Sequence, residues 1–332
     1  MRAIVLGDDG VKLDVERPDP VPRPGEVLVR VLQAGICETD LQLIAGYKAF
    51  RGVLGHEFVG VALAGAFEGR RVVGEINCSC RTCRTCAAGR PGHCPHRTVL
   101  GILNHDGAFA DLIAVPERNL HLVPDGVDTD VAVFTEPLAA AFQIPAQIPI
   151  ARDDRIVILG DGRLGQLCAQ VLAGISDRVL VIGKHMEKLA LLEGQGIEGR
   201  LLQDRAADRG ADLVIDCTGS PTGLTTALEL VRPRGTIVLK TTIAAPQTLD
   251  LAPVVVDEIA VVGSRCGPFE RALDALVHGL VDVRPLISDR FDLSEGMRAL
   301  TRAAEPGVLK VLLSTGADAG PDDRTGRARF TA

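Results

Sequence analysis

Short apolar runs broken by proline and glycine characterise the first part of the chain. Examples are EVLVRVLQAG at 26–35 and FVGVALAG at 58–65. These short apolar runs, interrupted by proline and glycine, predict a mostly β domain of short strands over residues 1–145. The pattern returns near the C-terminus and ends with the apolar run LKVLLS at 309–314. We therefore expect residues 285–315 to complete the first domain.

The pattern changes in the middle of the chain, where apolar runs alternate with helical stretches. The runs lack a polar alternation, as is typical of strands buried on both faces. Strands alternating with helices predict βαβ units and a parallel sheet. Residues 146–284 are therefore predicted to form a doubly wound α/β domain. Its expected strands are RIVILG (155–160), RVLVIG (178–183), ADLVIDCTG (211–219), GTIVLKTT (235–242) and EIAVVGSRCG (258–267).

Length and composition narrow the class of protein. A chain of 332 residues is long enough for about two domains. The net charge of −7 argues against a nucleic-acid partner, which would need clustered Lys and Arg. No apolar run is long enough to predict a membrane span, and the N-terminus lacks the pattern of a signal peptide. We expect a cytoplasmic protein with a disordered polar tail over 316–332.

Four cysteines form the most specific motif of the chain. Cys80, Cys83, Cys86 and Cys94 follow the spacing C-x2-C-x2-C-x7-C. Four thiolates about 2.3 Å from one ion suit tetrahedral zinc. The alternatives are unrelated thiols or a disulfide, and the expected reducing compartment makes both less favourable. A site with four protein ligands has no open position, so the quartet predicts a structural zinc site and places the chemistry elsewhere.

A glycine-rich loop directly follows the first strand of the predicted α/β domain. The sequence GDGRLG has the pattern G-x-G-x-x-G in a strand–turn–helix context, which predicts a dinucleotide site. Glycine permits the tight turn, the approach of a pyrophosphate and close packing of helix on strand. The helix N-terminus supplies N–H groups for the phosphates. The loop consists of Gly160, Asp161, Gly162, Arg163, Leu164 and Gly165.

The end of the next strand bears on the choice between NAD and NADP. NAD sites usually place Asp or Glu about 20 residues after the loop, where it accepts from the ribose 2′-OH. Gly183 occupies this position, and Lys184 and His185 follow it. The lack of a carboxylate and the presence of basic groups favour NADP. In the alternative, Lys184 is only a solvated charge and Glu187 serves as the acidic residue.

Three separate segments suggest a second, reactive zinc site. Cys37 lies in GICETD, His56 and Glu57 lie in GHEFVG, and Glu136 lies in TEPLA. Cys, His and Glu are plausible zinc ligands, and a catalytic zinc keeps one position open for water or substrate. Residue types alone make this grouping weak, because a lone Cys or His is more often a core residue.

The order of these motifs makes the family recognisable. With GICETD, GHEFVG, the cysteine quartet, DGAFADL, EPLA, GDGRLG and DCTG, the chain resembles the zinc-dependent medium-chain dehydrogenases. These include alcohol, polyol, threonine and glucose dehydrogenases. The resemblance implies a GroES-like, mostly β catalytic domain beside a Rossmann domain. It also implies two zinc ions, NAD(P), a small alcohol or carbonyl substrate, and a homodimer or homotetramer.

The resemblance also assigns roles at the reactive zinc. Cys37 and His56 would ligate it, and Glu57 would be a ligand or a neighbour that exchanges with water. Glu136 stands where polyol and sugar dehydrogenases have a glutamate, which points to polyol, sugar or amino-alcohol substrates. Asp40 is expected to fix the tautomer of His56, as carboxylates beside metal-bound histidines do.

The resemblance also suggests residues that take the proton of the substrate and residues that lie near the cofactor. Thr39 would take the proton of the substrate hydroxyl, because a hydroxyl can accept and donate at once. Cys217, Thr218 and Gly219 end a predicted strand and would lie near the nicotinamide ribose, and Arg265 would reach cofactor or substrate.

The alternative functions are a nucleotide sensor without turnover and a zinc-free quinone or enoyl reductase. The proton-relay residues and both metal motifs argue against them.

Overall fold

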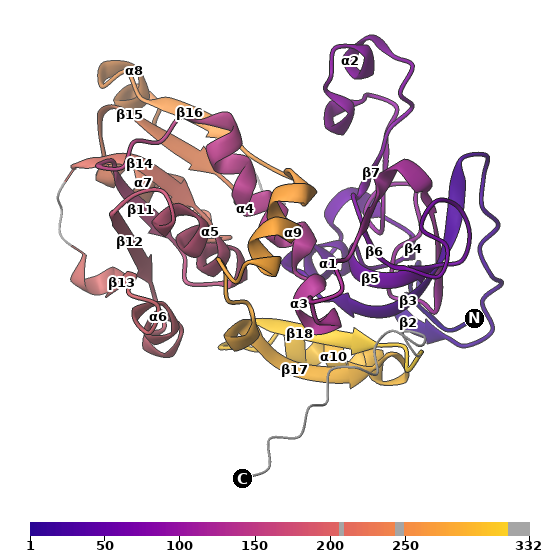
Figure 1. Cartoon of the computed structure of the whole chain (residues 1–332). Helices are drawn as coiled ribbons and strands as arrows, with labels where there is room; N and C mark the ends of the chain where they lie inside the picture. The colour runs from indigo at the N-terminus through magenta and orange to yellow at the C-terminus, as the bar shows by residue number, and fades with distance from the viewer. Residues whose placement is uncertain (206–208, 243–248, 318–332) are drawn as a thin grey trace. The chain divides into compact units, whose positions relative to one another are not determined.

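The computed structural model describes residues 1–205, 209–242 and 249–317. The chain divides into two compact units (Figure 1). Met1–Phe134 and the described residues from Ile287 onward form the first unit, and Thr135–Leu286 forms the second. Most of the predicted tail, residues 318–332, lies outside the described residues. None of the helices described is both long and apolar enough to cross a bilayer.

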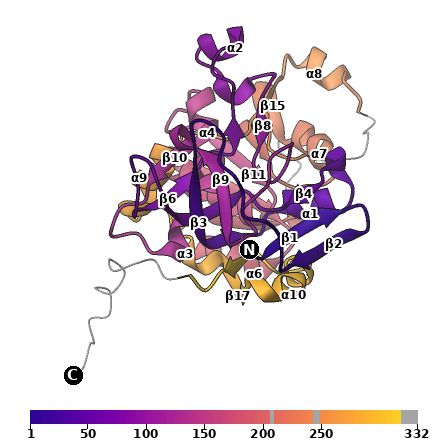
Figure 2. The same ribbon diagram turned by 90° about the vertical axis from the view of Figure 1, so that its right-hand side faces the viewer.

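The first unit is mostly β, and this confirms the predicted class of the domain. Its larger sheet has the order β10-β6-β5-β3-β18-β17, and β9 also pairs with β3. The smaller sheet β2-β1-β4 lies at one side of the unit, where its strands are seen next to one another (Figure 2). A short hairpin, β7 and β8, encloses the cysteine-rich loop.

The strands of the first unit are β1 (Ala3–Gly7), β2 (Gly10–Asp14), β3 (Glu26–Gly35), β4 (Gly52–Val53), β5 (Glu57–Ala62), β6 (Arg71–Gly74), β7 (Asn77–Cys78), β8 (Thr98–Val99), β9 (Leu112–Pro116), β10 (Leu120–Leu122), β17 (Ile287–Asp292) and β18 (Lys310–Ser314). Its helices are α1 (Glu38–Ile44), α2 (Arg84–Ala87), α3 (Thr129–Ala132) and α10 (Gly296–Ala303). All six residues of β5 are buried, because this strand lies inside the larger sheet. The return of the chain through β18, antiparallel to β3, completes that sheet.

The second unit contains the predicted parallel sheet. Its order, β13-β12-β11-β14-β15-β16, is the strand order 3-2-1-4-5-6 of the dinucleotide-binding fold, and every neighbouring pair is parallel. Its strands are β11 (Arg155–Leu159), β12 (Arg178–Gly183), β13 (Glu198–Leu201), β14 (Ala211–Asp216), β15 (Val231–Leu239) and β16 (Ala260–Gly263). Its helices are α4 (Thr135–Gln147), α5 (Arg163–Ala173), α6 (Met186–Glu193), α7 (Gly223–Leu230), α8 (Ala252–Val256) and α9 (Phe269–Val277).

Aliphatic side chains hold the second unit together. Val157, Leu159, Val214 and Ile237 come from three adjacent strands and belong to one buried cluster. The unit begins at α4, which packs against α5 and α9. The predicted boundary near residue 145 lies inside α4, close to its end, whereas the compact unit begins at Thr135.

Candidate zinc and nucleotide sites

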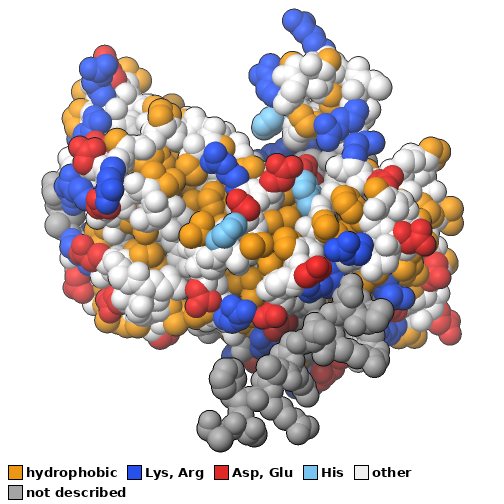
Figure 3. Space-filling model, viewed as in Figure 1, with side chains coloured by type: hydrophobic (Ala, Val, Ile, Leu, Met, Phe, Trp, Pro, Cys, Tyr) orange, Lys and Arg blue, Asp and Glu red, His pale blue; other side chains and the backbone are white. Residues whose placement is uncertain are grey.

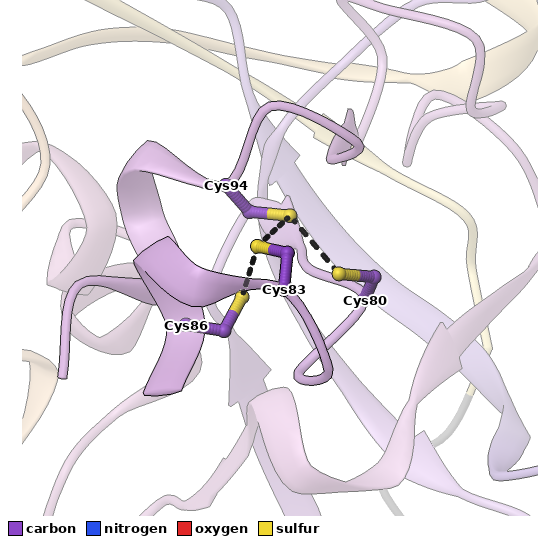
Figure 4. A group of neighbouring side chains, drawn as sticks. All are labelled: Cys80, Cys83, Cys86 and Cys94. Atoms are coloured by element: carbon purple, nitrogen blue, oxygen red, sulfur yellow. Dashed lines mark hydrogen bonds between the residues drawn. The ribbon is translucent and has the colours of Figure 1, made fainter. Parts of the chain in front are cut away.

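The cysteine quartet closes around one point in the loop between β7 and β8 (Figure 4). The Sγ atoms of Cys83 and Cys86 lie 3.5 Å apart, those of Cys83 and Cys94 3.8 Å, and those of Cys94 and Cys80 3.4 Å. Sulfur atoms that share a tetrahedral zinc lie about 3.8 Å apart when each bond is about 2.3 Å. The four thiols therefore fit a zinc ion.

The surroundings act differently on the four thiols: backbone N–H groups lower the pKa of Cys80 and Cys83, whereas burial raises the pKa of Cys86 to about 12. The backbone N–H of Thr82, which donates to the sulfur of Cys80, contributes most to lowering the pKa of that thiol to about 5. Arg81, Arg84 and Arg90 are exposed on the same loop, and the loop sequence has no carboxylate between the first and last cysteine. Figure 3 shows Lys and Arg side chains gathered over the lobe that carries α2. These cations offset the net negative charge of a zinc ion with four thiolates.

A second group of ligand atoms forms where β3 leads into α1 and where β5 begins. One ligand atom each from Cys37, His56 and Glu57 lies within 4.8 Å of the others. His56 and Glu57 are buried, with 3% and 1% of their surface exposed. The structure thus brings together three of the four residues predicted for the reactive zinc.

Asp40 organises this second group. Its carboxylate accepts the backbone N–H of Cys37 at 2.8 Å and that of Gly55 at 3.3 Å, and its Oδ1 lies 3.2 Å from Nδ1 of His56. With Nδ1 facing Asp40, Nε2 of His56 is left for a metal. Burial contributes most to the pKa of His56 and lowers it, but the charges of Asp40 and Cys37 together hold that pKa well above its ordinary value. Thr39 Oγ1 lies 3.8 Å from Cys37 Sγ.

The two carboxylate oxygens of Glu57 differ in their surroundings. Its Oε2 forms an ion pair with Nζ of Lys310, which is buried at the start of β18 and lies 3.4 Å from the carbonyl oxygen of Ile36. Gly35, opposite Glu57 in the sheet, makes room for this pair, because a Cβ there would lie 2.5 Å from Oε2. Oε1 of Glu57 is buried and has no hydrogen-bond partner among the described residues. An unpaired buried carboxylate oxygen beside a thiol and an imidazole fits a metal ion.

The predicted roles of Glu136 and Arg265 stay predictions. Glu136 lies in the first turn of α4, in the second unit, so its coordination of the reactive zinc stays a prediction. Arg265 follows β16, and its Nη1 lies 3.3 Å from Sγ of Cys266. A role of Arg265 toward cofactor or substrate likewise stays a prediction.

The glycine loop has the geometry that its sequence predicts. Gly160 adopts φ +109°, and a Cβ there would lie 2.7 Å from the carbonyl oxygen of Cys217. A Cβ at Gly165 would lie 1.9 Å from the carbonyl oxygen of Gly160, whereas no atom of the part of the chain that the structure describes comes within 4 Å of a Cβ at Gly162. The loop is therefore tight against β14 and open at Gly162, where a pyrophosphate can approach. Arg163 and Leu164 begin α5.

The end of β12 differs from what the sequence suggested. A carboxylate is present there, because Asp161 of the glycine loop extends toward Gly183. Its Oδ2 accepts the backbone N–H groups of Lys184 at 2.6 Å and His185 at 2.7 Å. The premise of the NADP preference, that no carboxylate lies at this position, is therefore wrong.

The end of β14 carries the third predicted cofactor segment. Oδ1 of Asp216 accepts both the backbone N–H and the hydroxyl of Thr218, at 3.0 and 2.8 Å, and the hydroxyl of Thr241 at 3.0 Å. Cys217 follows Asp216 directly, and Gly219 adopts φ +62°. The turn is thus fixed by Asp216 and Thr241, which the sequence analysis missed. A carboxylate at the end of an otherwise apolar run was the available signal for Asp216.

Lys310 was also missed. Its signal was a lysine at the start of the apolar run LKVLLS, a position predicted to be buried on a strand. Because a buried lysine needs a partner, this position could have predicted an acidic residue on a neighbouring strand.

Comparisons with known proteins identify the family. Residues 23–125 match the family described as alcohol dehydrogenase GroES-like domain, and residues 164–278 match zinc-binding dehydrogenase. The L-threonine 3-dehydrogenase of Streptomyces coelicolor is 32% identical, over 89% of this chain and 94% of that protein. The sorbitol dehydrogenase of Halalkalibacterium halodurans is 29% identical, over 90% of this chain and 94% of that protein.

Solved structures are similar along nearly the whole chain. The alcohol dehydrogenase rspB from Escherichia coli CFT073, in complex with NADH, superposes with a TM-score of 0.86 at 29% identity, over 95% of this chain and 99% of that one. A zinc-binding dehydrogenase from Sinorhizobium meliloti 1021, bound to NADP, gives a TM-score of 0.85 at 26% identity, over 94% and 98%. The predicted fold class is confirmed.

Proposed function

Because the chain belongs to the zinc-dependent medium-chain dehydrogenases and is an NAD(P)-dependent oxidoreductase of alcohols, we propose that it oxidises a secondary alcohol, polyol, sugar or amino alcohol at a zinc held by Cys37 and His56. The single observation that carries the proposal is the convergence of Cys37, His56 and Glu57. We propose two zinc ions per chain, one in each cysteine-containing cluster.

The residues around the reactive cluster have separable tasks. When bound, zinc supplies a Lewis acid that lowers the pKa of a substrate hydroxyl, and nicotinamide accepts hydride. Cys37 and His56 would hold the metal, and Asp40, whose Oδ1 lies 3.2 Å from Nδ1 of His56, would orient that ring. Glu57 offers the metal only Oε1, because Lys310 occupies Oε2. Glu136 is proposed as a further ligand.

Thr39 is proposed as the first acceptor of the substrate proton. Its hydroxyl lies beside the Cys37 sulfur, and a hydroxyl can accept one proton while it donates another. Gln42 in the next turn of α1 donates to Oε1 of Glu38 at 3.0 Å and carries no titratable group. The proton would therefore pass to solvent or to the cofactor ribose.

The class of substrate follows from the donor set and from the relatives. A Cys/His/Glu set has more oxygen character than Cys/His/Cys, and glutamate at the position of Glu136 points to polyol, sugar or amino-alcohol substrates. The similar proteins named sorbitol dehydrogenase and L-threonine 3-dehydrogenase fall in this class. We propose a homodimer or homotetramer in the cytoplasm. The preference for NADP over NAD stays a prediction of the sequence, and the Asp161 carboxylate weighs against it.

The proposal predicts the metal content and activity of one variant. Wild-type protein should contain about two zinc ions per chain and reduce NAD or NADP with a member of a polyol, sugar and amino-alcohol panel. Cys37→Ser should keep one zinc and lose at least roughly 100-fold in kcat/KM, since even partners of metal ligands are worth 10–100-fold. Elemental analysis and absorbance of the reduced cofactor measure both.

Cys78→Ser is the matched control. Cys78 is close in sequence to the quartet, but its sulfur is in neither ligand group, and burial raises the pKa of its thiol to about 11. This variant should keep both zinc ions and full activity. Cofactor binding without turnover on any panel member would favour the nucleotide sensor, and an unchanged zinc content in Cys37→Ser would refute the reactive zinc site.

A further inference from the structure

The side chain of Asp161 occupies the space at the end of β12 that a side chain at position 183 would otherwise fill. Gly183 is the last residue of β12, where an NAD site usually carries an acidic residue. A Cβ at Gly183 would lie 2.3 Å from Oδ2 and 2.6 Å from Cβ of Asp161. The glycine therefore makes room for a carboxylate that comes from the glycine loop and not from the strand.

This carboxylate also occupies backbone donors that a phosphate would need. His185 is the N-cap of α6, and the N–H groups at a helix start are the common anchor for an anionic group. The N–H groups of Lys184 and His185 both donate to Oδ2 of Asp161, and Nδ1 of His185 lies 3.0 Å from Oδ1. A 2′-phosphate arriving there would find these donors occupied.

The nearby charges also disfavour a second anion. Burial, the largest contribution, raises the pKa of Asp161, but the hydrogen bonds from His185 and from the two backbone N–H groups outweigh it and lower that pKa below its ordinary value. The carboxylate is thus ionised at neutral pH. Of the basic groups nearby, the side chain of Lys184 is exposed, and Arg200 on the neighbouring β13 pairs with Glu198 at 2.6 Å.

We propose that Asp161 is the specificity-determining residue for the cofactor, and that it makes the protein bind NAD(H) more tightly than NADP(H). The carboxylate acts at the ribose 2′ position by its charge and by the two N–H groups that it holds. This inference rests on the proposed function, because it concerns the same nucleotide site. It replaces the sequence-based preference for NADP.

Binding of nucleotides to the full chain tests this without turnover. The chain has no tryptophan, so the emission of bound NADH and NADPH can be titrated with little background from protein. Calorimetry with 5′-AMP and 2′,5′-ADP isolates the 2′-phosphate. Wild-type protein should bind NADH more tightly than NADPH by roughly tenfold or more, the scale of one charge interaction near a surface.

Asp161→Asn should reduce the NADH over NADPH ratio by roughly tenfold, because it removes the charge and keeps the shape. Asp274→Asn, which changes an exposed carboxylate in the same unit, is the matched control and should leave the ratio unchanged. If Asp161→Asn disturbs the loop, the pair of changes Asp161→Gly and Gly183→Asp moves the carboxylate back to the strand. That double variant should restore the preference for NADH that Asp161→Gly alone loses.

The outcomes separate the two proposals. Tighter binding of NADPH by the wild-type chain, or an unchanged ratio in a folded Asp161→Asn protein, would overturn this inference and leave the dehydrogenase intact. Failure of the wild-type chain to bind either dinucleotide or 5′-AMP would overturn the nucleotide site, and the proposed function with it.

Discussion

Two buried carboxylates, Glu57 and Asp161, are stabilised by different kinds of partner. Glu57 meets the ammonium group of Lys310, whereas Asp161 meets backbone N–H groups and the imidazole of His185. Removing one member of a buried ion pair typically costs about 3–5 kcal/mol, because the other charge is left without compensation. The N–H groups that donate to Asp161 come from the turn after β12, so Asp161 keeps its charge wherever the glycine loop is packed against that turn.

The charge on Asp161 predicts how cofactor preference depends on pH. Its lowered pKa keeps the carboxylate ionised as pH falls from about 8 to about 6, whereas a phosphate monoester gains a proton near pKa 6. Repulsion between Asp161 and a 2′-phosphate therefore weakens as pH falls, and NADPH should gain severalfold on NADH over this range. Fluorescence titrations of both cofactors at several pH values measure the ratio.

The comparison that isolates Asp161 uses its Asn variant. Asp161→Asn removes the carboxylate charge, and with it the repulsion that protonation of a 2′-phosphate relieves. The shift in the ratio should therefore be smaller in Asp161→Asn than in wild type. Equal shifts would mean that Asp161 has no influence on the 2′ position.

At the residue scale, the sequence motifs identified the candidate metal ligands. They did not identify side chains whose partners lie far away in the sequence, such as Asp161 and Lys310. Cys37, His56 and Glu57 were found from their motifs, and they do converge. Asp161 is predicted as a cofactor-binding residue of the glycine loop, but sequence spacing does not tell that its side chain turns toward Gly183. Lys310 is far from Glu57 in the chain, so their pairing depends on β18 entering the larger sheet next to β3.

At the scale of elements, the segment before β9 fixes the position of His56. Backbone N–H groups of Gly107, Ala108 and Phe109 donate to the carbonyl oxygens of residues 53–55 at 2.8–2.9 Å. The chains come so close that a Cβ at Gly107 would lie 2.2 Å from the carbonyl oxygen of Gly55. This contact explains physically why the DGAFADL stretch accompanies the metal motif.

Gly107→Ala should therefore displace Gly55 and His56 and weaken the reactive metal site. We expect this variant to lose one of the two proposed zinc ions and to retain the ion in the cysteine quartet, because the quartet lies on a separate hairpin. Gly126→Ala is the control, since no atom lies within 4 Å of a Cβ there and its φ is not positive. Elemental analysis checks both, and full zinc content in Gly107→Ala would contradict the argument.

The elements of the second unit were largely predictable, and those of the first unit were less so. Continuous apolar runs identified β11, β12 and β14, which are largely buried, as expected inside a parallel sheet. They also identified β15 and β16, although β16 is an edge strand and mostly exposed, so the expectation that it is buried on both faces is wrong. The short edge strand β13, Glu198–Leu201, was missed, since its sequence EGRL has no apolar run. In the first unit, β4, β7 and β8 have two residues each and form through tertiary pairing, which local sequence does not encode.

At the scale of the whole molecule, the two clusters of metal-ligand atoms and the glycine loop belong to different units, and Glu136 is the one proposed metal ligand that the second unit contributes. The cysteine quartet and the cluster of Cys37, His56 and Glu57 lie in the first unit. The glycine loop, Asp161 and the turn after β14 lie in the second. The chain enters the second unit at α4 and returns through β17, so the first unit is discontinuous in sequence. A change that affects only one unit should therefore leave the ligand of the other bound.

Removal of the structural zinc tests this independence. Cys94 is fully buried, and its sulfur lies next to two others of the quartet, so Cys94→Ser should prevent zinc binding there. We expect zinc content to fall from about two to about one per chain and the thermal stability of the first unit to drop, because metal binding is coupled to folding of the loop. The Kd for NADH should stay within about twofold of the wild-type value, which is well below the tenfold change that a loss of about 1.4 kcal/mol of binding free energy would produce. Hydrogen exchange should rise in the loop between β7 and β8, and Cys78→Ser should change none of these quantities. If a folded Cys94→Ser protein no longer binds NADH, the nucleotide site depends on the quartet and the two units are not independent.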